Sequence, residues 1–354
     1  MSYIKWDAEG IEVVQPGEED LKKHVAEQFN QLQSLQFTQT AHCYRATHLK
    51  TQGCVRGTFT INDNLPAHLA QGMFAKPGKH DCIIRYSSLP PQITPDTAHA
   101  PRGVGLKVFD VPGDKLFGGS DTQDFTFNNY KILELRDIPG SSKLADGLIK
   151  NYDDLSRFSA MEAAQNDKTI AEISGTIAPQ AYMSSMPQYS QGAYRYGDYV
   201  AKFGVFPTGE EQLKLKNIEI KETDPVTILS DSLKRFHAEH TATYSFQVQL
   251  LENLKDQPVE DIGIEWDDKK YPFVEVAKLE FEPQDSFDDA FRTWFDDSGV
   301  ACNPWHGLKE HQPLGGAQRV RRQVYAESRK KRLRMNGKKE YTEPKSLSEV
   351  PVSA

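Results

Sequence analysis

The feature that most constrains the fold is a series of short strand-like segments, each bounded by glycine, proline or aspartate. Short runs rich in β-branched and aromatic residues between such turn residues are typical of β-strands. The segments are Cys54–Ile61, Cys82–Ser88, Gly103–Phe109, Asn129–Leu135, Tyr199–Phe206, Tyr244–Glu252 and Phe273–Phe281. Long helical insertions between them indicate one α+β domain built around an antiparallel sheet or barrel.

Helices are expected before, between and after these strands. Residues 18–37 carry apolar side chains at helical spacings of three and four. Asp224-Pro225 predicts a helix start, with an N-cap aspartate and proline at the first helical position. This helix is expected to run to about His240. Further helices are expected over 285–296 and from about 317 to 335, and a mixture of helix and loop over 141–193. We therefore predict a single domain over 1–354, with its core at about 40–285 and a flexible tail at 336–354.

Composition excludes several classes of protein. The chain has 354 residues and a net charge of −8, which argues against a general nucleic-acid binder. It contains no apolar run near the ~20 residues of a membrane span. The first residues lack the pattern of a secretory signal, and the four cysteines form no Cys-x-x-Cys pair. We expect a cytoplasmic protein with structural thiols.

The basic helix near the C-terminus carries the first candidate site. Arg321, Tyr325, Ser328 and Arg332 are spaced by four, three and four residues, so they share one helical face. Two cations beside a tyrosine favour its phenolate form, and a phenolate is an established haem-iron ligand. The alternative is a solvated basic surface helix, because many other arginines and lysines surround these residues.

Three further segments carry residues with possible chemical roles. His48 precedes a strand and could act as a general acid–base group, while Arg45 could bind a carboxylate. Asn128 and its neighbour Asn129 lie in an apolar run where amides need partners, in a turn or on a ligand. Arg85, within an apolar run, needs an anionic partner, either a protein carboxylate or a ligand propionate.

Taken together and in this order, these segments resemble the haem-binding barrel of the catalase family, in particular its short catalase-related members. The resemblance spans roughly residues 40–335 and rests on five segments. They are Arg45-Ala46-Thr47-His48-Leu49-Lys50 with Gly57-Thr58-Phe59, Arg85-Tyr86-Ser87-Ser88, Pro101-Arg102-Gly103 to Val108, Asn128-Asn129 to Arg136-Asp137, and the set Arg321, Tyr325 and Arg332.

The resemblance implies an eight-stranded antiparallel barrel with helical insertions and a role for each matched residue. Tyr325 would be the proximal ligand of haem b, paired with Arg321 in the C-terminal helix. His48 would move the peroxide proton, and Asn128 would orient the peroxide. The other implied haem contacts are propionate binding by Arg45, Arg85 and Arg332, and packing near the ring by Phe59 and Val108.

The chain also departs from the family pattern. Thr47 stands where catalases usually carry valine, and the same threonine occurs in relatives that isomerise fatty-acid hydroperoxides. The family's channel phenylalanines fall at Leu133, Glu134 and Ser141. These differences favour a wider pocket and organic or fatty-acyl hydroperoxides, cleaved by a peroxidase or hydroperoxide isomerase.

Other functions remain open on the sequence. They are a compact true catalase acting on hydrogen peroxide, a non-enzymatic haem carrier or sensor, and a nucleic-acid binder using the basic helix 317–339. The expected partner is a small-molecule peroxide, and a fatty-acid hydroperoxide is one possible substrate. Neither a nucleic-acid partner nor a membrane span is expected. The chain is shorter than a classical catalase, and a homodimer or a monomer is as consistent with it as a tetramer.

Overall fold

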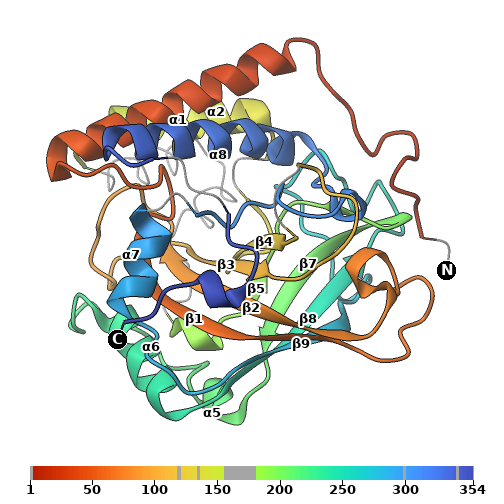
Figure 1. Cartoon of the computed structure of the whole chain (residues 1–354). Helices are drawn as coiled ribbons and strands as arrows, with labels where there is room; N and C mark the ends of the chain where they lie inside the picture. Colours follow the sequence, from red (N-terminus) through yellow and green to blue (C-terminus); the bar gives the residue numbers. More distant parts are fainter. Residues whose placement is uncertain are drawn as a thin grey trace.

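The computed structural model describes residues 3–117, 121–133, 136–154, 181–297, 300–339 and 343–353. Figure 1 shows its helices and strands. The strands are β1 Lys50–Ile61, β2 Gly78–Ser88, β3 Arg102–Val108, β4 Gln123–Asn128, β5 Gln188–Tyr189, β6 Tyr194–Tyr196, β7 Tyr199–Pro207, β8 Ala242–Leu250 and β9 Val274–Phe281. The α-helices are α1 Glu18–Thr40, α2 Ile138–Lys150, α5 Glu210–Lys214, α6 Ile228–Glu239, α7 Asp289–Asp297 and α8 Gly316–Met335.

The strands close into a barrel of eight. They follow the order β5-β4-β3-β2-β1-β9-β8-β7, and β5 also pairs with β7, which returns the sheet to its start. The two-residue strand β5 makes this closure, because Tyr189 pairs with Asn128 while Gln188 pairs with Val205. Strand β6 extends the sheet from β7. Every pairing is antiparallel, so the predicted eight-stranded α+β barrel is confirmed.

Aromatic side chains fill the barrel interior. The ring of Phe246 lies 5.1 Å from those of Phe59 and Phe125, and 5.5 Å from that of Phe203. All four side chains are fully buried. Burial of such large apolar groups is the main source of barrel stability. Because the interior is packed, a ligand as large as a haem has to bind outside this core.

Three helices form a layer against one side of the barrel. In Figure 1, α1, α2 and α8 lie side by side above β3 and β4. Val25 and Leu32 of α1 pack with Val320 and Val324 of α8 and with Ala145 of α2 in one buried cluster. The apolar spacing seen in the sequence of α1 therefore attaches this helix to the helix that carries Tyr325.

Two of the predicted elements differ from the structure for a physical reason that their hydrogen bonds show. The segment Asn129–Leu135 is not a strand in its described part, and the strand is the preceding β4. The side chain of Asn129 accepts a hydrogen bond from the backbone N–H of Arg102 at 2.9 Å, and local side-chain bonds of this kind compete with the sheet. Helix α6 begins at Ile228 because Asp224 instead closes a turn, accepting from the N–H of Lys221 at 2.8 Å.

The C-terminal segment, expected to be flexible, packs against the protein where it is described. Arg56 donates to the carbonyl of Val350 at 3.0 Å, and the N–H of Ser353 donates to Asp288 at 2.8 Å. Val350 is buried beside α7. Glu343 forms ion pairs with Arg329 at 3.2 Å and with Lys107 at 3.4 Å. Residues 343–353 are thus held by polar contacts that sequence periodicity does not reveal.

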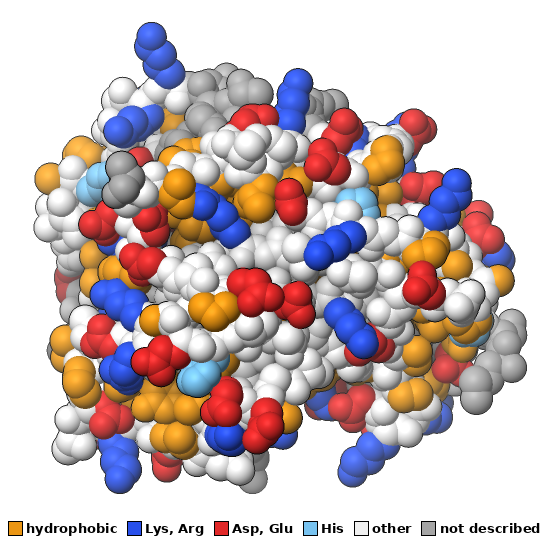
Figure 2. All heavy atoms as spheres, turned by 60° about the horizontal axis from the view of Figure 1, so that its bottom comes forward, with side chains coloured by type: hydrophobic (Ala, Val, Ile, Leu, Met, Phe, Trp, Pro, Cys, Tyr) orange, Lys and Arg blue, Asp and Glu red, His pale blue; other side chains and the backbone are white. Residues whose placement is uncertain are grey.

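The surface carries charges of both signs. Figure 2 shows acidic and basic side chains interspersed over one face, and among the residues described there no continuous basic surface appears. Such a face does not favour a polyanionic partner. In the described ranges, no helix combines the length and apolar character needed to cross a membrane.

Replacement of Phe246 by alanine is expected to lower the free energy of unfolding by about 3–5 kcal/mol, because the barrel centre cannot collapse around the cavity. Urea denaturation would measure the change. Val226→Ala is the control, since this side chain is 61% exposed and its loss should cost less than about 0.5 kcal/mol. Equal effects of the two substitutions would contradict a packed barrel centre.

Candidate active site

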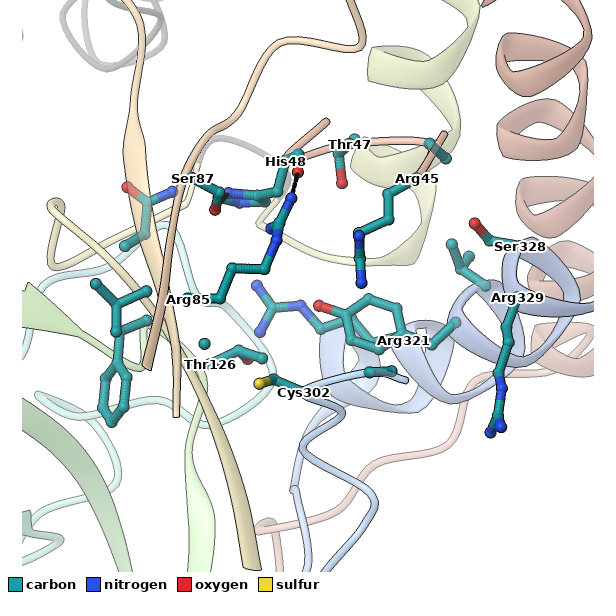
Figure 3. Close-up of a pocket in the computed structure, with 18 of the residues that line it drawn as sticks. Arg45, Thr47, His48, Arg85, Ser87, Thr126, Cys302, Arg321, Ser328 and Arg329 are labelled. Carbon is teal, nitrogen blue, oxygen red and sulfur yellow. Dashed lines mark hydrogen bonds between the residues drawn. The ribbon is translucent and has the colours of Figure 1, made fainter. Parts of the chain in front are cut away.

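One cavity lies between the barrel and α8. Its empty volume is about 950 Å³, including the part open to solvent. Eight of the residues singled out from the sequence line it. They are Arg45, Thr47, His48, Arg85, Asn128, Arg321, Tyr325 and Arg332. Segments far apart in the chain therefore meet at one site, which Figure 3 shows.

His48 is held in place through its backbone and its ring. Its φ is 51°, a left-handed conformation that is uncommon outside glycine and is often found at functional sites. Its N–H donates to the carbonyl of Leu89 at 2.9 Å. Ser87 Oγ lies 3.0 Å from Nδ1 and donates to the carbonyl of Gly103 at 3.3 Å. With the serine proton directed to Gly103, the tautomer that fits this contact has the ring proton on Nδ1 and a lone pair on Nε2.

Gly103 is required by this arrangement. A Cβ atom at this position would lie 2.3 Å from Cε1 of His48 and 2.9 Å from the carbonyl oxygen of Phe127. Any larger residue would displace the imidazole ring or strand β4. The glycine in Pro101-Arg102-Gly103 therefore provides the space that the His48 ring occupies.

The environment of His48 keeps its imidazole neutral. Burial is the main cause that lowers the pKa of His48 to about 3, and the charges of Arg85, Arg321 and Arg45 add to it. A neutral imidazole with a free Nε2 can accept a proton from a molecule in the cavity.

Three arginines share a single carboxylate at one end of the cavity. Asp296, next to last in α7, lies 2.9 Å from Arg45 and 3.5 Å from Arg85. Arg332 is 3% exposed, and its Nε has no hydrogen-bond partner among the described residues. Burial lowers the pKa of Arg332 to about 10, with the nearby Asp296 acting in the opposite direction. The cluster therefore carries more positive than negative charge, and further anions bound there would stabilise it.

Arg85 also links this cluster to His48. Its Nη2 donates to the backbone carbonyl of His48 at 2.9 Å, and its Nε donates to Thr51 Oγ1 at 3.0 Å. Figure 3 shows the bond to His48 and shows the side chains of Arg45 and Arg85 pointing into the same space. An anion bound by the arginines would thus lie close to His48.

The lining residues fit a haem. Three arginines and one carboxylate leave two positive charges, which match the two propionates of iron protoporphyrin. Arg321 and Tyr325 lie on the α8 side of the cavity. Asn128 Oδ1 is buried without a hydrogen-bond partner in the described part of the chain. These residues supply a phenol oxygen that can bind iron, cations that can bind propionates, and a polar atom that can accept a hydrogen bond from a ligand.

Phe59 and Val108 are placed elsewhere. Neither belongs to the described lining of the cavity, and both lie in the packed barrel core. Phe59 follows the start of β1 at Lys50 by nine residues, roughly 30 Å along an extended strand. Val108 likewise ends β3, whereas the cavity borders Val104 and Gly105 of that strand. Their expected contact with the ring is not supported by this placement.

The positions of the missing channel phenylalanines are also away from the cavity where described. Leu133 packs with Ile262 and Ala317, and Ser141 is buried in α2, where its hydroxyl donates to the carbonyl of Asp137 at 2.9 Å. Glu134 lies outside the described residues. Of the departures noted in the sequence, Thr47 is the one that the structure brings to the cavity.

Some site residues were not identified from the sequence. Asp296 resembles many other acidic residues in a charged helix, and only its position beside Arg45 reveals it. Ser87 belongs to a matched segment but had no assigned role. Cys302 and Gln191 also line the cavity. The cationic face of α8 is directed toward the cavity at Arg321 and Arg332, which weighs against the alternative of a solvated nucleic-acid-binding helix.

Comparison with known proteins supports the fold. The sequence matches no protein-family model and no curated protein. Solved structures do match. A fungal catalase has a TM-score of 0.58 at 17% identity, covering 85% of this chain and 61% of its own. Catalase A from Saccharomyces cerevisiae has a TM-score of 0.58 at 17% identity, covering 85% and 63%. A bacterial catalase has a TM-score of 0.55 at 13% identity, covering 91% and 65%.

The chain therefore has the catalase fold. It spans less than two thirds of the length of each of these three catalases. The likeness establishes the barrel and its helices. Activity, cofactor and substrate have to be argued from the residues of this chain.

The resonances of the His48 ring nitrogens are expected not to titrate between pH 5 and 8, because the folded protein binds this proton only near pH 3. The unfolded chain binds it near pH 6.5, so this group destabilises the folded state progressively as the pH falls from about 6.5 toward 3. Nitrogen-15 NMR of labelled protein, with His48→Gln for assignment, would measure this. A midpoint near 6.5 would contradict the buried, cation-flanked position.

Gly103→Ala is expected to displace the His48 ring and break its contact with Ser87. The same NMR spectrum should show a changed Nδ1 resonance. Gly78→Ala in β2 is the matched control, since its added Cβ would meet only ordinary contacts, the nearest at 3.4 Å. An unchanged His48 signal in Gly103→Ala would show that the glycine does not define the ring position.

Proposed function

We propose that this protein is a haem-dependent enzyme that cleaves the O–O bond of peroxides, with organic or fatty-acyl hydroperoxides as preferred substrates. The observation that carries the proposal is the composition of one cavity. It combines a neutral histidine, an unpartnered asparagine oxygen, a tyrosine beside an arginine, and an arginine cluster with two uncompensated positive charges. Each feature has a role in binding haem or handling a peroxide.

Tyr325 would hold the iron through its phenol oxygen, with Arg321 one helical turn earlier on the same face of α8. Arg45, Arg85 and Arg332 would hold the propionates beside Asp296. When bound, the haem supplies the redox chemistry of O–O cleavage.

His48 would handle the proton. Its Nε2 accepts the proton of the peroxide O–H, and the imidazole can return it to the other oxygen as the bond breaks. Ser87 Oγ lies 3.0 Å from Nδ1 and would favour the required tautomer by accepting the Nδ1 proton. The amide of Asn128 would orient the peroxide by hydrogen bonding. Burial of the site strengthens these polar interactions.

Thr47 supports the preference for organic hydroperoxides. Figure 3 shows its side chain beside those of Arg45 and His48 at the cavity, where catalases usually carry valine. A hydroxyl here can hydrogen-bond the imidazole or an oxygen of the substrate and alter the response to hydrogen peroxide.

An optical spectrum of the haem-supplemented protein tests the cofactor and its ligand. We expect a high-spin ferric Soret band that is lost or strongly shifted in Tyr325→Phe and retained in the control Tyr199→Phe, a tyrosine on β7 whose ring contacts Tyr3 and Lys5. Turnover of a fatty-acid hydroperoxide, with product analysis, would separate isomerase from peroxidase. A Soret band without turnover of any peroxide would favour a haem carrier or sensor.

Thr47→Val is expected to raise the ratio of hydrogen peroxide to organic hydroperoxide turnover, because it removes the hydroxyl beside His48. Oxygen release and hydroperoxide loss, measured side by side, give this ratio. Thr60→Val on the exposed end of β1 is the control. Rapid dismutation of hydrogen peroxide by the unmodified protein, with no reaction of organic hydroperoxides, would instead identify a compact catalase.

A further inference from the structure

The segment 343–353 runs along one wall of the large cavity without lining it. Figure 1 shows this segment in dark blue, passing β2 and reaching α7. Its described residues form one short 3₁₀ turn, Leu347–Glu349, and otherwise irregular chain. None of them belongs to the described lining of the cavity. The segment therefore acts on the cavity through the wall residues that it contacts.

One end of the segment packs on α7. Val350 is buried in a cluster with Phe291 and Phe295 of α7 and with Cys54 of β1. Phe295 also lines the large cavity, and it precedes Asp296, the carboxylate that Arg45 and Arg85 share. The segment, the helix and the cavity are therefore consecutive layers, and a displacement of α7 would move the cavity wall.

Polar contacts hold α7 between the segment and the barrel. Arg56 of β1 donates to the carbonyl of Val350 at 3.0 Å, and its guanidinium group lies 4.9 Å from the ring centre of Phe291. The N–H of Ser353 donates to Asp288, just before the start of α7, at 2.8 Å. The position of α7 thus depends on contacts that the segment supplies.

Glu343 attaches the other end of the segment to α8 and β3. Its carboxylate lies 3.2 Å from Arg329 and 3.4 Å from Lys107. Lys107 would keep a partner without it, because both oxygens of Asp124 accept from Nζ at 2.8 Å. The side chain of Arg329 is 22% exposed and can reach water. Detachment of Glu343 therefore avoids the large cost of leaving a buried charge unpaired.

We propose that segment 343–353 is a releasable strap, and that its detachment loosens α7 and opens the cavity wall on that side. Its apolar anchors are few, chiefly Val350, with Leu347 packed beside the same cluster. Segments with few buried apolar contacts open locally at a lower free energy than the core. The opening involves neither haem nor peroxide, so it stands independently of the proposed enzyme chemistry.

Cysteine alkylation of the folded, full-length protein tests the strap. Cys54 and Cys82 are each at most 1% exposed, but Cys54 packs with α7 and the strap, whereas Cys82 belongs to the barrel core. Global unfolding exposes both thiols, while strap release exposes Cys54 alone of the two. Iodoacetamide at pH 8, followed by peptide mass mapping, gives the two rates.

We expect Cys54 to react faster than Cys82 in the unmodified protein. Glu343→Gln should raise the Cys54 rate roughly fivefold, the effect of losing an ion pair at the upper end of the usual range, and leave the Cys82 rate unchanged. Val350→Ser should also raise the Cys54 rate, because it removes the buried anchor while Glu343 keeps its ion pairs.

Glu349→Gln is the matched control. It makes the same charge change in the same segment, but Glu349 is exposed and accepts only from the N–H of Lys345, at 3.3 Å, within the segment itself. The proposal is overturned if Cys54 and Cys82 react at equal rates in every variant, because opening is then global. It is also overturned if neither Glu343→Gln nor Val350→Ser exceeds Glu349→Gln. Segment 343–353 would then be a fixed part of the fold, whatever the activity of the cavity.

Discussion

The cavity between the barrel and α8 is defined by the buried positive charge of three arginines. Arg45, Arg85 and Arg332 converge from three separate parts of the chain on one carboxylate, that of Asp296. Buried guanidinium groups that outnumber their anions are unfavourable in a protein that only needs to fold. Their arrangement is understandable if the missing negative charge comes from a ligand. The same excess charge acts on His48 and helps to keep its imidazole neutral.

The barrel decides where this charge can be placed. Its interior is filled by aromatic rings around Phe246, so no ligand the size of a haem can enter it. The outer side of β2–β4 is instead covered by the helical layer, and α8 is held there by α1. The large cavity is the space left between barrel and helices. Closure of the barrel through the two residues of β5 fixes Asn128 at the edge of that space.

Two small residues set the position and orientation of the His48 ring. Gly103 leaves room for the His48 ring, and Ser87 orients it. Arg85 binds the backbone of His48 while facing Asp296 with its guanidinium group. Arg85 therefore links the proposed proton-transfer residue to the arginine cluster.

The sequence by itself determined the elements with strong local signals. Six of its seven strand segments and the helices that became α1, α7 and α8 follow from periodicity and turn residues. The spacing of Arg321, Tyr325 and Arg332 placed them on one helical face, since an α-helix repeats every 3.6 residues. Motif order was enough to select the eight residues that meet in the cavity.

The tertiary structure alone decided the rest, because the remaining features depend on contacts between distant segments. Asp296 became part of the site through its approach to Arg45 across 251 residues. Phe59 and Val108 were placed in the barrel core by strand length and register, the C-terminal segment was anchored by Arg56 and Asp288, and Lys202 was buried beside the ring of Trp266.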